Sequence, residues 1–487
     1  MEDVLLEEPI EVPVNIISIY RFYRSEAERK KVERLMNAML HKRPLLVRGF
    51  FGEGKSRAGA LSGRGVAELM LLNKSFVKRY GRIQVIFACP LRALRDEVYK
   101  TYFFDIGFVL KAHDEVCPLL KQRLRQGKEY LIALAEHLKS DTCLYSKHIG
   151  HLKQAMQNGR VVVTTHTLSI LPVVLSYAMK RKPLVIFDEA EDFLERVSRG
   201  LNEDIVEAVK RIDIKLYRKI RRMLQKEQHQ YFMRYTTFKQ LLRDSVFISA
   251  TFPRVIEENY HLLVDRELEV TWLFSVGEKR QDVMVIYKGK LLWKDYPKWK
   301  PTVQSQVAEL VRVTTSKYGV VGIASRNYQL TRDLEAVLSS MGFKVVSDLD
   351  PDFRSKILSS EVIIVTTKGR LYRGINILRG ISDVPVVIGF YQGAEPKEHY
   401  PPISDYILEH CGEEIFKTYV RELVYAKNLQ SLYRFIRQRK NRHIMVLFDW
   451  RFHEAFYHFF RNKLYDEIVR VEVDGLSRVS DVAKLYI

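Results

Sequence analysis

The stretch that decides the fold is LLVRGFFGEGKSRAGA, residues 45–60. An apolar run leads into a glycine-rich turn and a helix-like segment follows, which predicts a strand, a loop and a helix. The turn fits G-x-x-x-x-G-K-[ST], a pattern whose backbone N–H groups, lysine and hydroxyl hold nucleotide phosphates and Mg²⁺. A glycine-rich turn without a ligand is the alternative. The residues expected to bind the nucleotide are Gly49, Gly52, Gly54, Lys55 and Ser56.

An acidic pair follows a second apolar strand. Residues 184–187 are apolar, and Asp188 and Glu189 come directly after them. A carboxylate at the carboxyl end of a parallel strand, beside a phosphate loop, is well placed to handle Mg²⁺ and an attacking water. We expect Asp188 to hold Mg²⁺ together with Ser56, and Glu189 to orient or deprotonate the water. A helix that merely begins with acidic residues is the alternative.

The composition is strongly basic. The 487 residues include 79 Lys and Arg against 59 Asp and Glu, a formal charge of +20. Such a chain attracts polyanions, so nucleic acid is the first partner to consider and an acidic membrane surface the second. The alternative is that the excess of lysine serves only to keep the protein soluble.

The chain has no sign of export or of membrane insertion. Its N-terminus is acidic rather than basic, and its most apolar window, residues 161–179, contains polar residues and Pro172. Four scattered cysteines without a CxxC pair favour a reducing compartment. We therefore expect a cytoplasmic protein with no membrane partner, and the sequence does not identify a protein partner.

Further segments, in the right chain order, resemble the motifs of superfamily 2 helicases. Three lie before residue 254 and resemble motif Ia, the next DNA-contacting strand and motif III: residues 85–98, 161–171 and 246–253. Three lie in the second half and resemble motifs IV, V and VI: residues 320–330, 363–377 and 428–438. The chain is most similar to the XPD/DinG branch, through residues 413–452 and the strand segment after motif V, and the helicase module of reverse gyrase is second.

The resemblance implies an α/β fold of two RecA-like parallel-sheet domains in tandem. It implies ATP hydrolysis with Mg²⁺ in the cleft between them, and single-stranded nucleic acid, DNA favoured, across both. An ATP-dependent helicase or translocase moving 5′ to 3′ is the resulting prediction. Departures from the pattern include Glu191 where His is common, Asn376 for Asp and Tyr433 for Gly. These leave open a catalytically weak clamp that holds nucleic acid, and an RNA helicase is a further alternative.

The resemblance also assigns roles to residues. The catalytic set is Lys55, Asp188, Glu189, Gln430, Arg434 and Arg437, with Gly374 at the nucleotide. One of the two arginines would reach the γ-phosphate, although both also fit a basic surface helix. Ser249 and Thr251 would couple the ATP state to nucleic acid. The residues expected to contact nucleic acid are Arg92, Thr165, His166, Arg326, Thr367 and Lys368.

The expected domain boundaries follow from the motifs. The first domain spans residues 20–275, with mainly helical inserts at 101–159 and 196–244; a linker covers 276–300 and the second domain 301–487. The XPD-like branch often carries four cysteines around an iron–sulfur cluster, but the first insert holds only Cys117 and Cys143 with several histidines. Because such clusters need four thiolates, we expect no cluster, and a mixed Cys/His zinc site is the alternative. The second insert has 13 Lys and Arg against 6 Asp and Glu, so either it contacts phosphates or it forms a solvated basic face.

Overall fold

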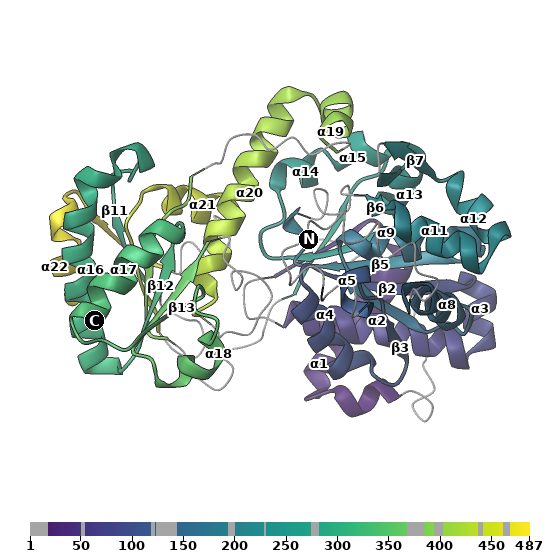
Figure 1. The fold of residues 1–487 in the computed structure, drawn as a ribbon, viewed down its shortest axis with the longest axis horizontal. Coiled ribbons are helices and arrows are strands. Elements are labelled where there is room, and N and C mark those ends of the chain that lie inside the picture. The colour runs from purple at the N-terminus through teal and green to yellow at the C-terminus, as the bar shows by residue number, and fades with distance from the viewer. Residues whose placement is uncertain are drawn as a thin grey trace, which may run out of the picture.

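The computed structural model shows two lobes, each built around one parallel sheet (Figure 1). It describes residues 18–49, 54–117, 122, 144–192, 200–227, 230–273, 282–367, 384–393, 403–436, 442–460 and 468–487. Each sheet has seven strands with helices packed on it, which confirms the predicted pair of RecA-like domains.

The first sheet contains the two strands that the sequence places beside the nucleotide. All of its neighbouring strands are parallel. Its order is β10 (Glu269–Trp272), β1 (Leu45–Arg48), β9 (Ser245–Ser249), β5 (Lys182–Asp188), β2 (Ile83–Cys89), β4 (Val161–Thr165) and β3 (Gly107–Val109). The central strands are almost continuously apolar because helices cover both faces of the sheet.

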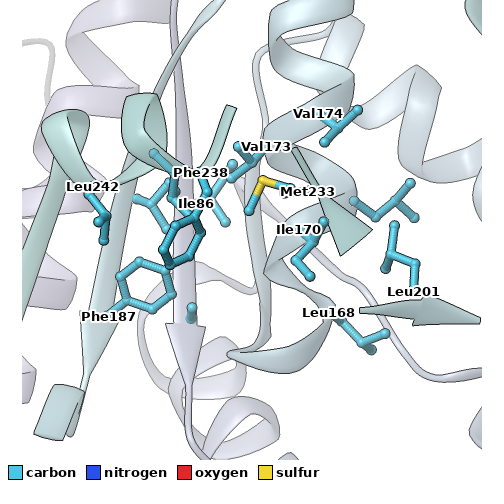
Figure 2. Close-up of a cluster of buried hydrophobic side chains, with 14 of the residues drawn as sticks. Ile86, Leu168, Ile170, Val173, Val174, Phe187, Leu201, Met233, Phe238 and Leu242 are labelled. Carbon is cyan, nitrogen blue, oxygen red and sulfur yellow. The ribbon is translucent and has the colours of Figure 1, made fainter. Parts of the chain in front are cut away.

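Two apolar clusters occupy the two faces of this sheet. One joins the sheet to α1 (Glu26–His41), α2 (Lys55–Leu72) and α3 (Lys74–Tyr80). The other joins it to α8 (Leu144–Gln157), α9 (Ile170–Ala178) and α13 (Tyr235–Asp244). Figure 2 shows part of the second cluster, where Phe187 of β5 and Ile86 of β2 lie near Phe238 and Leu242 of α13.

Small residues bring α2 close to the sheet. A Cβ atom at Gly59 would overlap the Ile248 side chain on β9, and one at Gly63 would lie 2.8 Å from Cδ1 of Ile186 on β5. Because real Cβ contacts are not that short, glycine is required for this approach. The approach sets the start of α2 against the carboxyl ends of β5 and β9.

The second sheet is also entirely parallel. Its order is β13 (Val345–Ser347), β14 (Val362–Thr366), β12 (Val321–Ser325), β15 (Val386–Gly389), β16 (Ile444–Leu447), β11 (Val283–Tyr287) and β17 (Val469–Val473). One face packs against α16 (Tyr296–Tyr318), α17 (Tyr328–Ser340) and α22 (Val479–Lys484). The other packs against α20 (Glu413–Tyr433) and α21 (Arg451–Phe460).

The boundaries differ from the sequence prediction in three places. The predicted linker, 276–300, is wrong as a linker because it contains β11, which lies between β16 and β17 inside the second sheet. Likewise β3, predicted inside the first insert, is the edge strand of the first sheet. The second insert contains α11 (Glu203–Ile212), α12 (Ile214–Arg221) and α13, as expected for a helical segment. It also contains an antiparallel sheet that was not predicted, in the order β6 (Leu201–Asn202), β8 (Gln230–Met233) and β7 (Leu224–Glu227).

One helix belongs to both lobes. Figure 1 shows α20 running from the second lobe to the first, where it follows α19 (Ile403–Cys411). Phe416, Tyr419 and Leu423 of α20 pack into the first domain's core, whereas Ala426 and Leu429 pack into the second's. No helix in the described part of the chain is both long and apolar enough to cross a membrane.

Candidate functional site

The predicted phosphate loop joins β1 to α2. Gly49 is buried just after β1, and Gly54 precedes α2 with φ of 72°, a left-handed conformation that favours glycine. Lys55 and Ser56 are the first two residues of the helix and are partly exposed. The N-terminus of this 18-residue helix presents N–H groups and a positive dipole end, which favours an anion. Gly52 lies outside the described residues.

Ser56 and Asp188 meet across the end of the first sheet. The Ser56 hydroxyl donates a hydrogen bond of 2.7 Å to Oδ1 of Asp188, which is 1% exposed. Its other oxygen, Oδ2, is buried and has no hydrogen-bond partner in the described part of the chain. Burial and the negative charge of Glu189 raise the pKa of Asp188 to about 7, against the Ser56 hydrogen bond and the Lys55 charge, which lower it. A buried carboxylate oxygen without a donor, next to a serine hydroxyl, fits the oxygen ligands that Mg²⁺ takes.

Glu189 connects the two domains. Its φ of 52° puts a non-glycine residue in the left-handed region, a strained conformation often found at functional sites. Its Oε2 accepts a hydrogen bond of 3.3 Å from Nε2 of Gln430, which projects from α20. Arg434 directly follows α20 and is partly buried. Arg437 and Gly374 lie outside the described residues.

Ser249 links the end of β9 to the segment after β5. Its hydroxyl donates a 2.8 Å hydrogen bond to Oε2 of Glu191, which is 2% exposed. The same hydroxyl accepts a 3.0 Å hydrogen bond from the backbone N–H of Thr251. Sequence reasoning noted Glu191 only as a departure from the usual His. Its position three residues after Asp188 was the signal that could have identified it as the partner of Ser249.

His166, which was predicted to contact nucleic acid, is buried in this structure, so the contact stays a prediction. His166 follows β4 and is completely buried, with its ring edge against Phe187. Its Nε2 lies 2.8 Å from the backbone carbonyl oxygen of Asp188. The histidine therefore supports the strained turn that carries Glu189.

Two other predicted nucleic-acid contacts are also buried. Arg326 is 6% exposed and donates a hydrogen bond of 2.7 Å to the carbonyl of Leu291, and Thr367 is 2% exposed. Both side chains are therefore enclosed by their own domain, and direct contact with nucleic acid stays a prediction for both. Arg92 is exposed and pairs with Asp114 at 2.6 Å, and Thr165 is partly exposed. Lys368 lies outside the described residues.

The described part of the first insert contains no cluster of three or more metal-ligating side chains. Cys117 is buried, His113 stacks on Tyr145 with ring centroids 4.6 Å apart, and His148 accepts a hydrogen bond from the backbone of Lys111. Burial, with the Lys111 charge second, lowers the pKa of His148 to about 4. Because Cys143 is outside the described residues, the absence of an iron–sulfur cluster stays a prediction.

Solved structures resemble the chain over nearly its whole length, although no protein-family model and no curated protein matches its sequence. An XPD helicase structure is 11% identical, with 93% of this chain and 100% of that chain covered and a TM-score of 0.53. The chain shares the fold of this structure, with two RecA-like parallel-sheet domains in tandem. An XPD in its apo form gives 12% identity, 92% and 100% coverage and a TM-score of 0.51. Xpd4 of S. tokodaii is 11% identical, with 92% of this chain and 100% of that chain covered and a TM-score of 0.50. At these identities the likeness shows the fold alone, and any statement about chemistry rests on the residues described above.

Proposed function

We propose that the chain is an ATP-driven helicase or translocase that acts on single-stranded nucleic acid, DNA in the first place. One observation carries the proposal. Ser56, at the start of α2, bonds to Asp188, whose other carboxylate oxygen has no hydrogen-bond partner among the described residues, while the neighbouring Glu189 bonds to Gln430 of the other domain. This combination is suited to a nucleotide whose hydrolysis is sensitive to the relative position of the domains.

The first domain would bind ATP and prepare the water. Lys55 would reach the β- and γ-phosphates, and Ser56 and Asp188 would hold Mg²⁺. A Mg²⁺ ion held there would supply positive charge to offset the negative charge of the phosphates. Glu189 would orient the attacking water and accept its proton, in a position fixed by Gln430 and by the turn that His166 supports.

The second domain would complete the site when the cleft closes. Arg434 follows the helix that carries Gln430, and Arg437 comes three residues later, so we expect one of them to approach a γ-phosphate. Ser249 and Glu191 would transmit the nucleotide state from β5 to the segment after β9. From the resemblance to the XPD/DinG branch, we expect movement 5′ to 3′ along the strand.

The deciding experiment is steady-state ATP hydrolysis with and without single-stranded DNA, at two salt concentrations, beside Lys55→Ala. A motor gives hydrolysis that the strand stimulates and that Lys55→Ala abolishes. Salt-sensitive binding without turnover would refute the motor and support the second candidate, a clamp, which Asn376 and Tyr433 motivate as departures from the motifs. Stronger stimulation by single-stranded RNA would assign the RNA-directed function instead.

A further inference from the structure

We propose that Trp293 is a stacking platform for a base of single-stranded nucleic acid, and that Arg326 is the residue that positions it. The inference rests on the proposed function, because it names where the strand contacts the second domain. It also gives Arg326, which was predicted to contact nucleic acid and is buried, a role in the same interface.

Trp293 lies beyond the carboxyl ends of the β-strands of the second sheet, where single-stranded nucleic acid is expected to run. It begins the short helix η5 (Trp293–Asp295), which follows the carboxyl end of β11, and Arg326 directly follows the carboxyl end of β12. Ligands of open parallel sheets bind outside the carboxyl ends of the strands. The Trp293 side chain is 40% exposed there.

The loop before Trp293 is held by three charged side chains, of which Arg326 and Asp449 are buried and Arg451 is half-buried. The Leu291 carbonyl accepts hydrogen bonds from Arg326 at 2.7 Å and from Arg451 at 3.4 Å. The Leu291 N–H donates to Oδ2 of Asp449 at 2.9 Å, and Asp449 also pairs with Arg451. Removing charged groups from water costs free energy unless they pair and hydrogen-bond with good geometry, as these side chains do. The arrangement fixes the backbone two residues before Trp293.

The indole ring is fixed as well. Tyr296 stacks on it with ring centroids 4.3 Å apart at 27°, and the guanidinium of Arg326 lies 5.2 Å from its centroid. Trp299, six residues later, is different: it is 7% exposed and its Nε1 donates to the Leu292 carbonyl. One tryptophan is thus part of the core, and the other is held rigidly at the surface. A rigid, partly exposed aromatic ring is what base stacking requires, since every base offers a π-face.

The charge of the segment favours a polyanion as the occupant. Residues 288–300 contain five lysines and one aspartate. Four of the lysines pair with carboxylates: Lys288 with Glu472, Lys290 with Glu454, Lys298 with Asp295 and Lys300 with Asp333. The exposed Lys294 directly follows Trp293 and is the lysine nearest to it in sequence. The whole chain carries a formal charge of +20. Phosphates attracted to this edge would bring their bases within reach of the exposed ring.

The test compares two strands that differ only in their bases. Binding is measured by fluorescence anisotropy with oligo-dT and with an abasic strand of equal length, for wild type, Trp293→Ala and Trp293→Phe. We expect Trp293→Ala to weaken oligo-dT binding about tenfold, to leave abasic binding unchanged, and to be largely rescued by Trp293→Phe. The matched control is Tyr457→Ala, another exposed aromatic residue, on α21, which should change neither.

The role of Arg326 has its own readout. Arg326→Lys keeps the charge but loses the planar fork that reaches the Leu291 carbonyl, so it should also weaken oligo-dT and spare the abasic strand. Unchanged oligo-dT binding by Trp293→Ala, or an equal loss on both strands, would overturn the stacking contact while leaving the proposed function intact. A wild-type protein that binds neither strand would instead overturn the proposed function.

Discussion

Replacing Ser249 by alanine tests whether the bond between β9 and Glu191 couples hydrolysis to nucleic acid. The substitution removes a donor from a carboxylate that is 2% exposed, and an acceptor from the Thr251 N–H. A hydrogen bond to a charged group contributes about 1.5–3 kcal/mol. If about 2 kcal/mol of this hydrogen-bond free energy links nucleic-acid binding to hydrolysis, its loss should lower the ratio of DNA-stimulated to basal ATP hydrolysis about 30-fold.

The same strand supplies a matched control. Ser245, at the other end of β9, is fully buried and donates a 2.7 Å hydrogen bond to the Leu241 carbonyl. Ser245→Ala removes a neutral hydrogen bond worth about 1 kcal/mol, far along the strand from Glu191. It should lower the unfolding temperature without changing the stimulation ratio. Equal stimulation ratios for the two variants would refute the coupling role of Ser249.

Three further predictions concern the site and the domain junction. Because the pKa of Asp188 is raised to about 7, ionisation between pH 6 and pH 8 destabilises the metal-free protein, and bound Mg²⁺ offsets this. Calorimetry should therefore show Mg²⁺–ADP raising the unfolding temperature more at pH 8 than at pH 6, and equal shifts would contradict it. His166→Ala should release the turn that carries Glu189 and lower kcat roughly 10- to 100-fold. The magnitude is taken from the loss of similar supporting contacts at metal sites. A change in KM alone would argue against this role of His166. Tyr406→Phe removes the hydrogen bond to the Leu263 carbonyl and should cost about 1 kcal/mol of unfolding free energy in urea; no measurable loss would mean that the bond does not stabilise the junction.

The nucleotide-binding elements could be predicted because their chemistry is local. The loop around Lys55 and the strand that ends at Asp188 can each be read from a short run of residues, and the structure places both runs at one sheet edge. The sequence does not show which β-strands pair with each other in the sheet. Leu45 of β1 pairs with Val246 of β9, two hundred residues away, and this pairing brings Ser249 to the site.

The missed features depend on tertiary packing. Arg326 resembles an exposed motif residue in sequence, but its acceptor is the Leu291 carbonyl, which comes from a segment predicted as a linker. The strand β11 is only five residues long and charged residues flank it, so its periodicity is weak. Its burial comes from β16 and β17, both more than 150 residues downstream. For the same reason the burial of His166 and Thr367 was not readable from their neighbours in sequence.

The helix shared by the two lobes makes the first domain discontinuous in sequence. Tyr406 of α19 packs against Phe238 of α13, with ring centroids 5.4 Å apart, and Phe416 and Leu423 of α20 join the same apolar cluster. A polypeptide cut after residue 273 would therefore lack part of its own core and expose apolar surface on α13 and α15 (Tyr260–Val264). The halves of this molecule are consequently not interchangeable modules. If the second lobe were joined to another ATP-binding lobe, that lobe would need an apolar surface on which α19 and the first turns of α20 could pack.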